Sequence, residues 1–434
     1  PSLSIRILDF SAAWAGCRYW GFCYLHGLKN AGLVQFTFNI YSSLLLIFFV
    51  HGLVYSLLCW RKMVSTGHRS FGWLALYLLM SILYIAPWML GFAGWYDNEP
   101  YKTILLYAPT RLSWGMGPVM FFYVQSLLNP GFRFGKKEVL HLVPLALYLI
   151  GHIGIWLHDI VLHRQPALLA AGIDPDFIDL TQVPGTLLLL FYFGLSLRYY
   201  LLYRRLIVQV VSFADVLLFR WVRNFLGAFL AFLISTILLE LLGLVFDLWY
   251  SDTWWYYLVF ALIFYYIAIA GYANQVEPRI AFMPHLLANR TTLLLSAPGT
   301  KGEAPDHPPQ YLEVEVMPAT PPAATDPELM AWKSKILDAV VGRQLYEDPD
   351  LTLVQLAQQL ATNPSQLSKA INQGFGKNFN DFINQYRVES LLEKLRRGEH
   401  RQQTLLALAY DAGFNSKATF NRAFQRHTGQ SPSE

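Results

Sequence analysis

Residues 411–432, DAGFNSKATFNRAFQRHTGQSP, decide how the C-terminal part of this chain folds. Gly413 interrupts one helical pattern, and Asn415 and Ser416 are residue types that cap the start of the next helix. That next helix has an apolar face, and its other face carries hydrogen-bond donors: Lys417, Thr419, Asn421, Arg422 and Arg426. Two helices joined by a short turn that contains glycine, the second polar and basic outside, predict a helix-turn-helix.

The same pattern occurs upstream. Asn363 is a good helix cap, and Pro364 fits the first turn of a helix that continues as SQLSKAINQG. The outer face of that helix is polar and consists of Ser365, Gln366, Ser368, Lys369 and Asn372. Between the two motifs, residues 379–395 have a helical pattern roughly 26 Å long. That length suits a rigid connection between two reading helices.

This tandem resembles the AraC family of bacterial transcription regulators. The resemblance covers about residues 351–432 and is carried by LAQQLATNPSQLSKAINQGFGKNFNDFINQYRVE and LALAYDAGFNSKATFNRAFQRHTGQSP. It implies that both second helices enter successive major-groove segments of double-stranded DNA. By position, the residues it implies as DNA-facing are Ser365, Gln366, Ser368, Lys369, Lys417, Thr419, Asn421 and Arg422. Ala418 stands where the family often has a polar residue, so only a methyl contact is expected there.

A plain helical bundle or a protein-binding module is the alternative for these helices. The net charge of this region is consistent with DNA binding but does not by itself distinguish it from the alternative. Residues 351–434 hold ten Lys and Arg against six Asp and Glu, a net charge of +4. Such a modest basic bias is enough for phosphate contacts but not for tight non-specific binding.

Composition indicates a membrane protein. The 434 residues are 54% hydrophobic and only 14% charged, whereas a soluble protein has about 25% charged residues. Apolar runs near the roughly 20 residues that a bilayer requires lie at about 37–60, 72–95, 104–128, 138–158, 184–203, 222–246 and 254–274. Tryptophan and tyrosine cluster at their ends, as at a membrane interface.

Loop charges predict the orientation. Basic residues fall in the first, third and fifth loops: Arg61, Lys62, Arg69, Arg133, Lys136, Lys137, Arg204, Arg205, Arg220 and Arg223. The intervening loops carry mainly acidic residues. Because Lys and Arg mark the cytoplasmic side, the N-terminus is expected outside and residue 274 inside. The predicted location is therefore a bacterial inner (cytoplasmic) membrane, with the DNA-binding part in the cytoplasm.

The predicted fold class is all-α, with four regions. Residues 1–33 are an uncertain N-terminal extension, 34–276 a seven-helix transmembrane domain, 277–326 a Pro-rich linker and 327–434 the DNA-binding domain. Within the linker, LLANRTTLLL is expected to form a short helix or strand. The membrane half contains FRWVRNFLGAFL at 219–230 and WWYYLVFALIFYYIAIAGYAN at 254–274. In these stretches it resembles seven-helix proteins with a C-terminal AraC-type domain from Bacteroidetes-like bacteria, which supports this architecture but implies no ligand.

Two charges inside predicted spans are candidates for a ligand site, because intramembrane charge is costly. They are Arg111, in APTRLSWGMGP, and Glu240. Either they pair or bind a ligand, or Arg111 reaches the interface and nearby hydroxyls such as that of Thr236 hold Glu240. A second pattern, His152, Trp156, Asp159 and His163, follows one helical face. Interfacial side chains explain it better than a metal, so no metal site is predicted.

The sequence predicts a one-component, membrane-embedded transcription regulator rather than an enzyme. It contains no phosphate-binding loop, dinucleotide fingerprint or nucleophile motif, and no cofactor is expected. The expected partners are DNA, the lipid bilayer, an unknown small-molecule or membrane signal, and a second copy in a homodimer. The alternatives are a membrane transporter or enzyme with an appended regulatory domain, and a membrane part that is only an anchor.

Overall fold

The computed structural model describes residues 38–110, 112–129, 132–163, 175–213, 220–246, 248, 250–274, 282–284, 291–296, 311–315 and 327–432. The chain divides into two compact units. The first consists of Pro1–Tyr123, Phe134–Gly194 and Arg223–Gln275; the second consists of Val124–Arg133, Leu195–Val222 and Val276–Glu434. Three helices, α4 (Ser113–Leu128), α7 (Pro175–Val210) and α9 (Arg220–Val245), contribute residues to both units.

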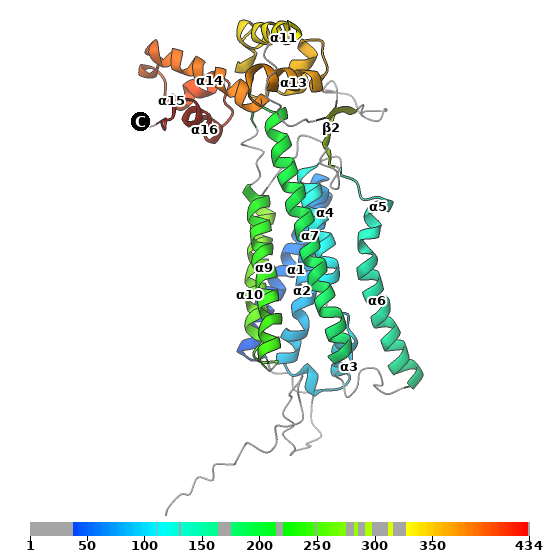
Figure 1. The fold of residues 1–434 in the computed structure, drawn as a ribbon. Helices are drawn as coiled ribbons and strands as arrows, with labels where there is room; N and C mark the ends of the chain where they lie inside the picture. The colour runs from blue at the N-terminus through cyan, green and yellow to red at the C-terminus, as the bar shows by residue number, and fades with distance from the viewer. Residues whose placement is uncertain are drawn as a thin grey trace, which may run out of the picture. The chain divides into compact units, whose positions relative to one another are not determined.

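Long apolar helices build the first unit (Figure 1). Besides parts of α4, α7 and α9, it contains α1 (Ile40–Thr66), α2 (Arg69–Phe92), η1 (Trp95–Asp97), α3 (Tyr101–Tyr107), α5 (Lys136–Val139), η2 (Leu140–Leu142), α6 (Val143–Trp156), the π-helix η3 (Leu157–His163) and α10 (Trp254–Ala273). The prediction of an all-α fold is confirmed for this unit.

Six helices in the described part of the chain are long and apolar enough to cross a membrane: Ile40–Thr66, Arg69–Phe92, Lys136–Leu162, Thr181–Val210, Arg220–Val245 and Trp254–Ala273. Large apolar side chains remain exposed along them, including Ile47, Leu57, Ile150, Leu187, Leu238 and Leu244. Exposed apolar surface of this extent is expected where lipid rather than water surrounds a helix.

The predicted span at 104–128 is not one helix. In its place, α3 ends at Tyr107 and α4 begins at Ser113. Pro109 lies between them; it cannot donate a backbone hydrogen bond, and it disfavours the helical conformation for the residue before it, Ala108, which is extended with a ψ of 133°. The physical reason for the break is therefore visible in the sequence, although hydropathy alone does not reveal it.

Helices α1 and α10 run parallel. At one end, the Trp254 indole donates to the carbonyl oxygen of Tyr41 at 3.1 Å. At the other end, the Lys62 ammonium donates to the carbonyl oxygen of Tyr272 at 2.9 Å. Between these ends, a Cβ atom added to Gly52 of α1 would lie 2.3 Å from Ile82 of α2 and 2.9 Å from Phe264 of α10. Only glycine allows so close an approach of the three helices.

The second unit contains a three-stranded antiparallel sheet and the C-terminal helices. The strands β1 (Phe282–Pro284), β2 (Thr291–Ser296) and β3 (Tyr311–Glu315) pair in the order β1-β2-β3. They lie in the predicted linker and are the exception to the all-α prediction. Within LLANRTTLLL, the strand alternative was therefore the correct one.

The helices that follow the sheet form two hydrophobic clusters. They are α11 (Pro327–Leu337), η5 (Asp338–Gly342), η6 (Leu345–Glu347), α12 (Leu353–Gln359), α13 (Pro364–Phe375), α14 (Phe379–Arg396), η7 (Glu399–Arg401), α15 (Leu405–Asp411) and α16 (Lys417–Thr428). Phe379, Phe382 and Ile383 of α14 pack with α11–α13, whereas Val388 and Leu391 pack with α15 and α16. Helix α14 therefore belongs to both cores and fixes their spacing.

Candidate nucleic-acid interface

The first helix-turn-helix, α12 and α13, forms as its capping residues predict. Thr352 and Gln355 cap α12 reciprocally. The Thr352 hydroxyl accepts the Gln355 main-chain N–H, and the side-chain oxygen Oε1 of Gln355 accepts the Thr352 main-chain N–H. The side-chain oxygen Oδ1 of Asn363 accepts the Ser365 N–H at 2.8 Å and so caps α13, with Pro364 in the first turn. Both helices therefore begin where local chemistry dictates.

The four predicted residues of α13 lie on or near its surface. Gln366 and Lys369 are exposed, and Ser365 and Ser368 are half-buried. The opposite face, Leu367, Ala370 and Ile371, is buried in the first cluster. The helix thus presents a polar strip with one positive charge, which is suited to contacts with phosphates and base edges.

The second helix-turn-helix, α15 and α16, depends on a close approach at its turn. Gly413 has a φ of +93°, and a Cβ atom there would lie 2.4 Å from the carbonyl oxygen of Tyr346. A residue other than glycine would therefore push the two motifs apart. Ser416, rather than Asn415, caps α16, because its hydroxyl accepts the Thr419 N–H at 3.2 Å.

Three of the four predicted residues of α16 reach the surface. Lys417 and Arg422 are exposed, and Asn421 is half-buried. Thr419, the fourth residue, was expected to face DNA but is fully buried. Its hydroxyl lies 2.9 Å from that of Ser416. Its position in the first turn of α16 commits it to the cap, so we do not retain it as a DNA-contacting residue. Ala418 is exposed, as a methyl contact requires.

Arg387 in α14 joins the two motifs, and it was not singled out from the sequence. Its guanidinium donates to the carbonyl oxygens of Tyr346 (2.7 Å) and Asp348 (2.6 Å) and lies over the ring of Phe414. The side chain is completely buried. Burial lowers the pKa of Arg387 to about 10, and Asp348 acts in the opposite direction, so the group stays charged at neutral pH. Its position four residues after Ile383 and four before Leu391, in an apolar stripe, was the available signal.

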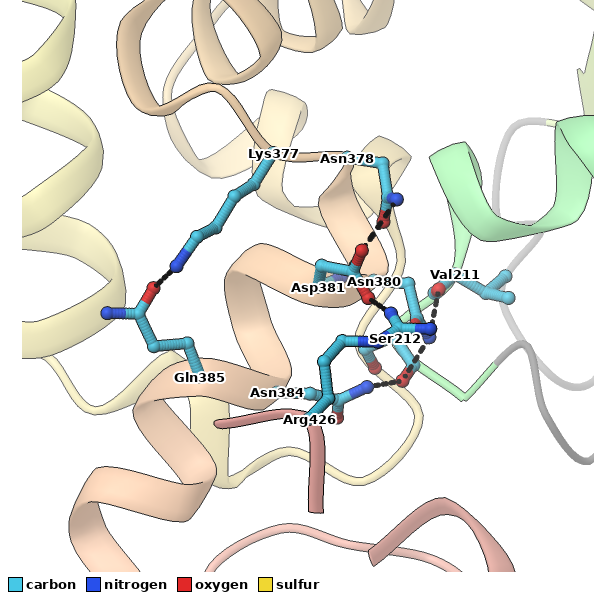
Figure 2. A network of polar contacts seen from close by, with 9 residues as sticks. All are labelled: Val211, Ser212, Lys377, Asn378, Asn380, Asp381, Asn384, Gln385 and Arg426. Atoms are coloured by element: carbon cyan, nitrogen blue, oxygen red, sulfur yellow. Dashed lines mark hydrogen bonds and ion pairs between the residues drawn. The ribbon is translucent and has the colours of Figure 1, made fainter. Parts of the chain in front are cut away.

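Arg426 has a partner on α14. Its guanidinium forms an ion pair with the carboxylate of Asp381 (Figure 2). Arg426 is the exposed member of this pair. Asp381 is also held by Asn378, whose side-chain oxygen Oδ1 accepts the Asp381 N–H at the start of α14. Arg426 therefore helps to fix α16 against α14.

Of the two membrane candidates, Arg111 lies outside the described residues. Glu240 in α9 accepts a hydrogen bond of 2.7 Å from the hydroxyl of Thr186 in α7. The hydroxyl of Thr236, the local partner considered from the sequence, instead lies 3.0 Å from both the Phe232 carbonyl oxygen and the Tyr256 hydroxyl. Glu240 thus joins two helices rather than being satisfied within its own.

Asp159, a member of the histidine pattern in the fourth predicted span, makes contacts other than to a metal ligand set. Asp159 is buried, and its two oxygens face the Tyr107 hydroxyl at 2.9 Å and the His158 ring nitrogen at 2.8 Å. Within the described residues, no three His, Cys, Asp or Glu side chains gather as metal ligands would. Asp159 instead connects η3 to α3.

Comparison with known proteins assigns the C-terminal part. Residues 356–434 match the model of a helix-turn-helix domain. The chain is 31% identical over 91 residues to uncharacterized HTH-type transcriptional regulators of Staphylococcus aureus strains COL, MSSA476 and N315. These matches cover 21% of this chain and 12% of each relative. No solved structure matches the chain.

The match falls on the two capped helix pairs and the helix that connects them. A helix-turn-helix of this kind implies DNA binding. The C-terminal part of this chain is an AraC-type helix-turn-helix domain of the kind found in transcription regulators, and it follows an N-terminal part whose helices are apolar enough to span a membrane.

Proposed function

We propose that this protein is a membrane-embedded, one-component transcription regulator that binds DNA sequence-specifically in response to a signal received by its transmembrane part. One observation carries the proposal: a single polypeptide contains both a tandem helix-turn-helix and six apolar helices of spanning length. The regions proposed for these roles are 34–276 for the membrane domain, 277–326 for the linker and 327–434 for the DNA-binding domain. No catalytic step is part of the proposal.

The proposed topology has seven crossings of the inner membrane, with the N-terminus outside and the DNA-binding domain in the cytoplasm. The parallel course of α1 and α10 supports this number. If only the six long helices crossed, alternation would make the first and the last antiparallel. A further crossing by the α3–α4 segment makes them parallel, and Lys62 and Tyr272 then lie on the same, cytoplasmic side.

For DNA recognition, we propose that α13 and α16 enter two successive major-groove segments. The connecting helix α14 has 18 residues, which makes it about 27 Å long. Together with the width of the flanking helices, this length suits reading positions about one DNA turn, or roughly 34 Å, apart. The proposed contacts are Ser365, Gln366, Ser368 and Lys369 from α13, and Lys417, Asn421 and Arg422 from α16.

We further propose that Arg111 and Glu240 take part in sensing. Support comes from the interhelical hydrogen bond of Glu240 and from the helix break between Tyr107 and Ser113, the interval of sequence that contains Arg111. Discontinuous membrane helices commonly occur at ligand sites, because their free backbone groups and helix ends bind polar ligands. A small ligand or a membrane component that binds there would act on α7 and α9 directly.

The test is DNA selection by the full-length protein in lipid nanodiscs. A library of duplexes with a randomised centre should be enriched for one sequence with two conserved segments about 10 base pairs apart. Chromatin pull-down with sequencing in the native cell should recover the same sequence. Enrichment of no sequence by either method would contradict the proposal.

A further inference from the structure

The three residues that follow α7 are buried in the second unit. Val211 and Ser212 are fully buried and Phe213 nearly so. Val211 pairs with Thr352 in an isolated antiparallel bridge, and the N–H and hydroxyl of Ser212 both donate to the carbonyl oxygen of Leu351, at 3.3 and 2.9 Å. Residues 211–213, which we call the docking segment, are therefore part of the core of the DNA-binding domain rather than a free loop.

Helix α14 binds the backbone of the docking segment (Figure 2). The Asn380 amide donates to the carbonyl oxygens of Val211 (3.2 Å) and Ser212 (2.8 Å), and the Asn384 amide donates to that of Ser212 (3.0 Å). Arg387 donates to the Ser212 hydroxyl at 3.0 Å.

These three α14 side chains are themselves almost completely buried. Buried donors are costly without acceptors. The α14 face is therefore built to receive a peptide backbone, and the docking segment supplies it.

The docked arrangement also places the end of α7 beside α16. Arg204 and Arg205 of α7 line a groove of about 640 Å³ together with Arg422 and Arg426 of α16. That volume is typical of a small-molecule site, roughly 300–1,000 Å³. A reading helix, by contrast, lies in a DNA groove about 12 Å wide between two phosphate backbones. The end of α7 therefore occupies part of the space beside Arg422 in which a phosphate backbone would run in the proposed complex.

The charges of this groove oppose docking. Arginines lie on both walls, and Asp381 is the carboxylate among its lining residues. Like charges that face each other raise the energy of the docked state, so the buried hydrogen bonds of the docking segment must hold it. Because charge repulsion opposes these hydrogen bonds, a small force on α7 should be enough to release the docking segment.

We propose that docking of residues 211–213 on α14 is an autoinhibitory contact, and that its release by the membrane part permits DNA binding. The inference rests on the proposed function, because it describes how that function is regulated. Helix α7 is continuous from Pro175 to Val210, so displacement of its membrane portion acts directly on the docking segment.

The first test weakens docking. Ser212→Ala removes the hydroxyl bonded to Leu351 and Arg387, and Asn380→Ala removes two donors that serve only the docking segment. In full-length protein in nanodiscs, the double variant should bind the enriched duplex roughly three- to tenfold more tightly, because apparent affinity rises with the undocked fraction. Ser65→Ala is the control, since its hydroxyl also donates to a main-chain carbonyl, that of Lys62, but belongs to the other compact unit.

The second test locks docking. Opposed residues of an antiparallel bridge have Cα atoms about 4.5–5.5 Å apart, within the range of roughly 4.4–6.8 Å that a disulfide requires. Val211→Cys combined with Thr352→Cys should therefore form a disulfide on oxidation. Binding of the same duplex should fall by about tenfold or more when docking is held, and a reductant should restore it. Thr352→Cys alone controls for loss of the α12 cap.

The outcomes separate the two proposals. Tighter binding by the double variant and reversible loss in the locked protein would support autoinhibition. Sequence-specific binding that neither change alters, or binding that weakens when docking is disrupted, would overturn the inference and leave the proposed function standing. Absence of DNA binding in the wild type, the double variant and the reduced protein would contradict the proposed function itself, and the inference with it.

Discussion

Arg387 connects three segments that are distant in sequence: the residues before the first motif, the turn of the second motif and the docking segment. A planar group with several fixed donors suits this position, because it can satisfy carbonyl oxygens that approach from different directions. Lysine has the same charge but cannot reproduce that geometry. The spacing of the two reading helices therefore depends on a side chain that does not contact DNA in our proposal.

At the DNA surface, Arg422 and Lys369 should have different roles. Arg422 can contact a guanine through two hydrogen bonds, so Arg422→Ala should cost roughly 1–3 kcal/mol and relax the preference at one base position. Lys369→Ala should weaken binding to all sequences alike. It should also reduce, by about one, the magnitude of the salt slope, which is the slope of the logarithm of the binding constant against the logarithm of the salt concentration. Binding of full-length protein to the randomised library at several salt concentrations measures both effects.

Arg397 provides a control for these two substitutions. It is exposed and pairs with Glu393 on the same helix, away from α13 and α16. Arg397→Ala should leave both the preferred sequence and the salt slope unchanged. If Arg422→Ala also leaves sequence and affinity unchanged, the assignment of α16 as a reading helix is wrong.

Glu240 and Arg111 form the second residue-scale prediction. If they act as a pair, Arg111→Glu with Glu240→Arg should partly restore the signal response that either single substitution abolishes in a reporter strain. Thr186→Val removes the observed hydrogen-bond partner of Glu240. It should reduce the signal response, but less than substitution of Glu240 itself. Mild, independent effects of Arg111→Ala and Glu240→Ala would remove the pair from consideration.

At the scale of elements, the α3–α4 segment determines the side on which the DNA-binding domain lies. Reporter fusions after residues 98, 132 and 274 should be outside, inside and inside, respectively, if this segment crosses the membrane. If it does not cross, the second and third fusions should be active outside. Paired cytoplasmic and periplasmic reporters at each site distinguish the two results.

The sequence predicted the elements whose causes are local. The positions of α13 and α16 follow from Asn363, Pro364, Gly413 and a serine or asparagine cap, all within a few residues of each helix start. The break after Tyr107 was harder to predict, because a window of hydropathy averages across Pro109.

Docking could not be predicted, because Ser212 and Asn380 are 168 residues apart. Nothing near either residue reveals that they meet. Thr419 was expected at the DNA surface because of its position on the helical face. That position does not reveal that its hydroxyl contacts the capping residue Ser416 and is buried.

For the whole molecule, we predict a homodimer formed through the membrane helices. Transcription regulators often use paired sites, and the sequence contains no coiled coil to join two copies. Light scattering of the protein in detergent, corrected for bound detergent, should give twice the mass of the 434-residue chain. A monomeric mass both with and without DNA would contradict this prediction.

The linker has a consequence for where regulation can take place in a cell. Residues 277–326 join the membrane to the DNA-binding domain, and as a flexible coil they would have a root-mean-square end-to-end distance on the order of 40 Å. Within that distance of the membrane, a released domain has an effective concentration on the order of millimolar, which falls steeply toward the roughly 165 Å that a fully extended chain of this length can reach. The promoter must therefore come close to the membrane to be bound. Transcription from it should depend on its position in the chromosome and on how often it lies near the membrane, as well as on the chemical signal.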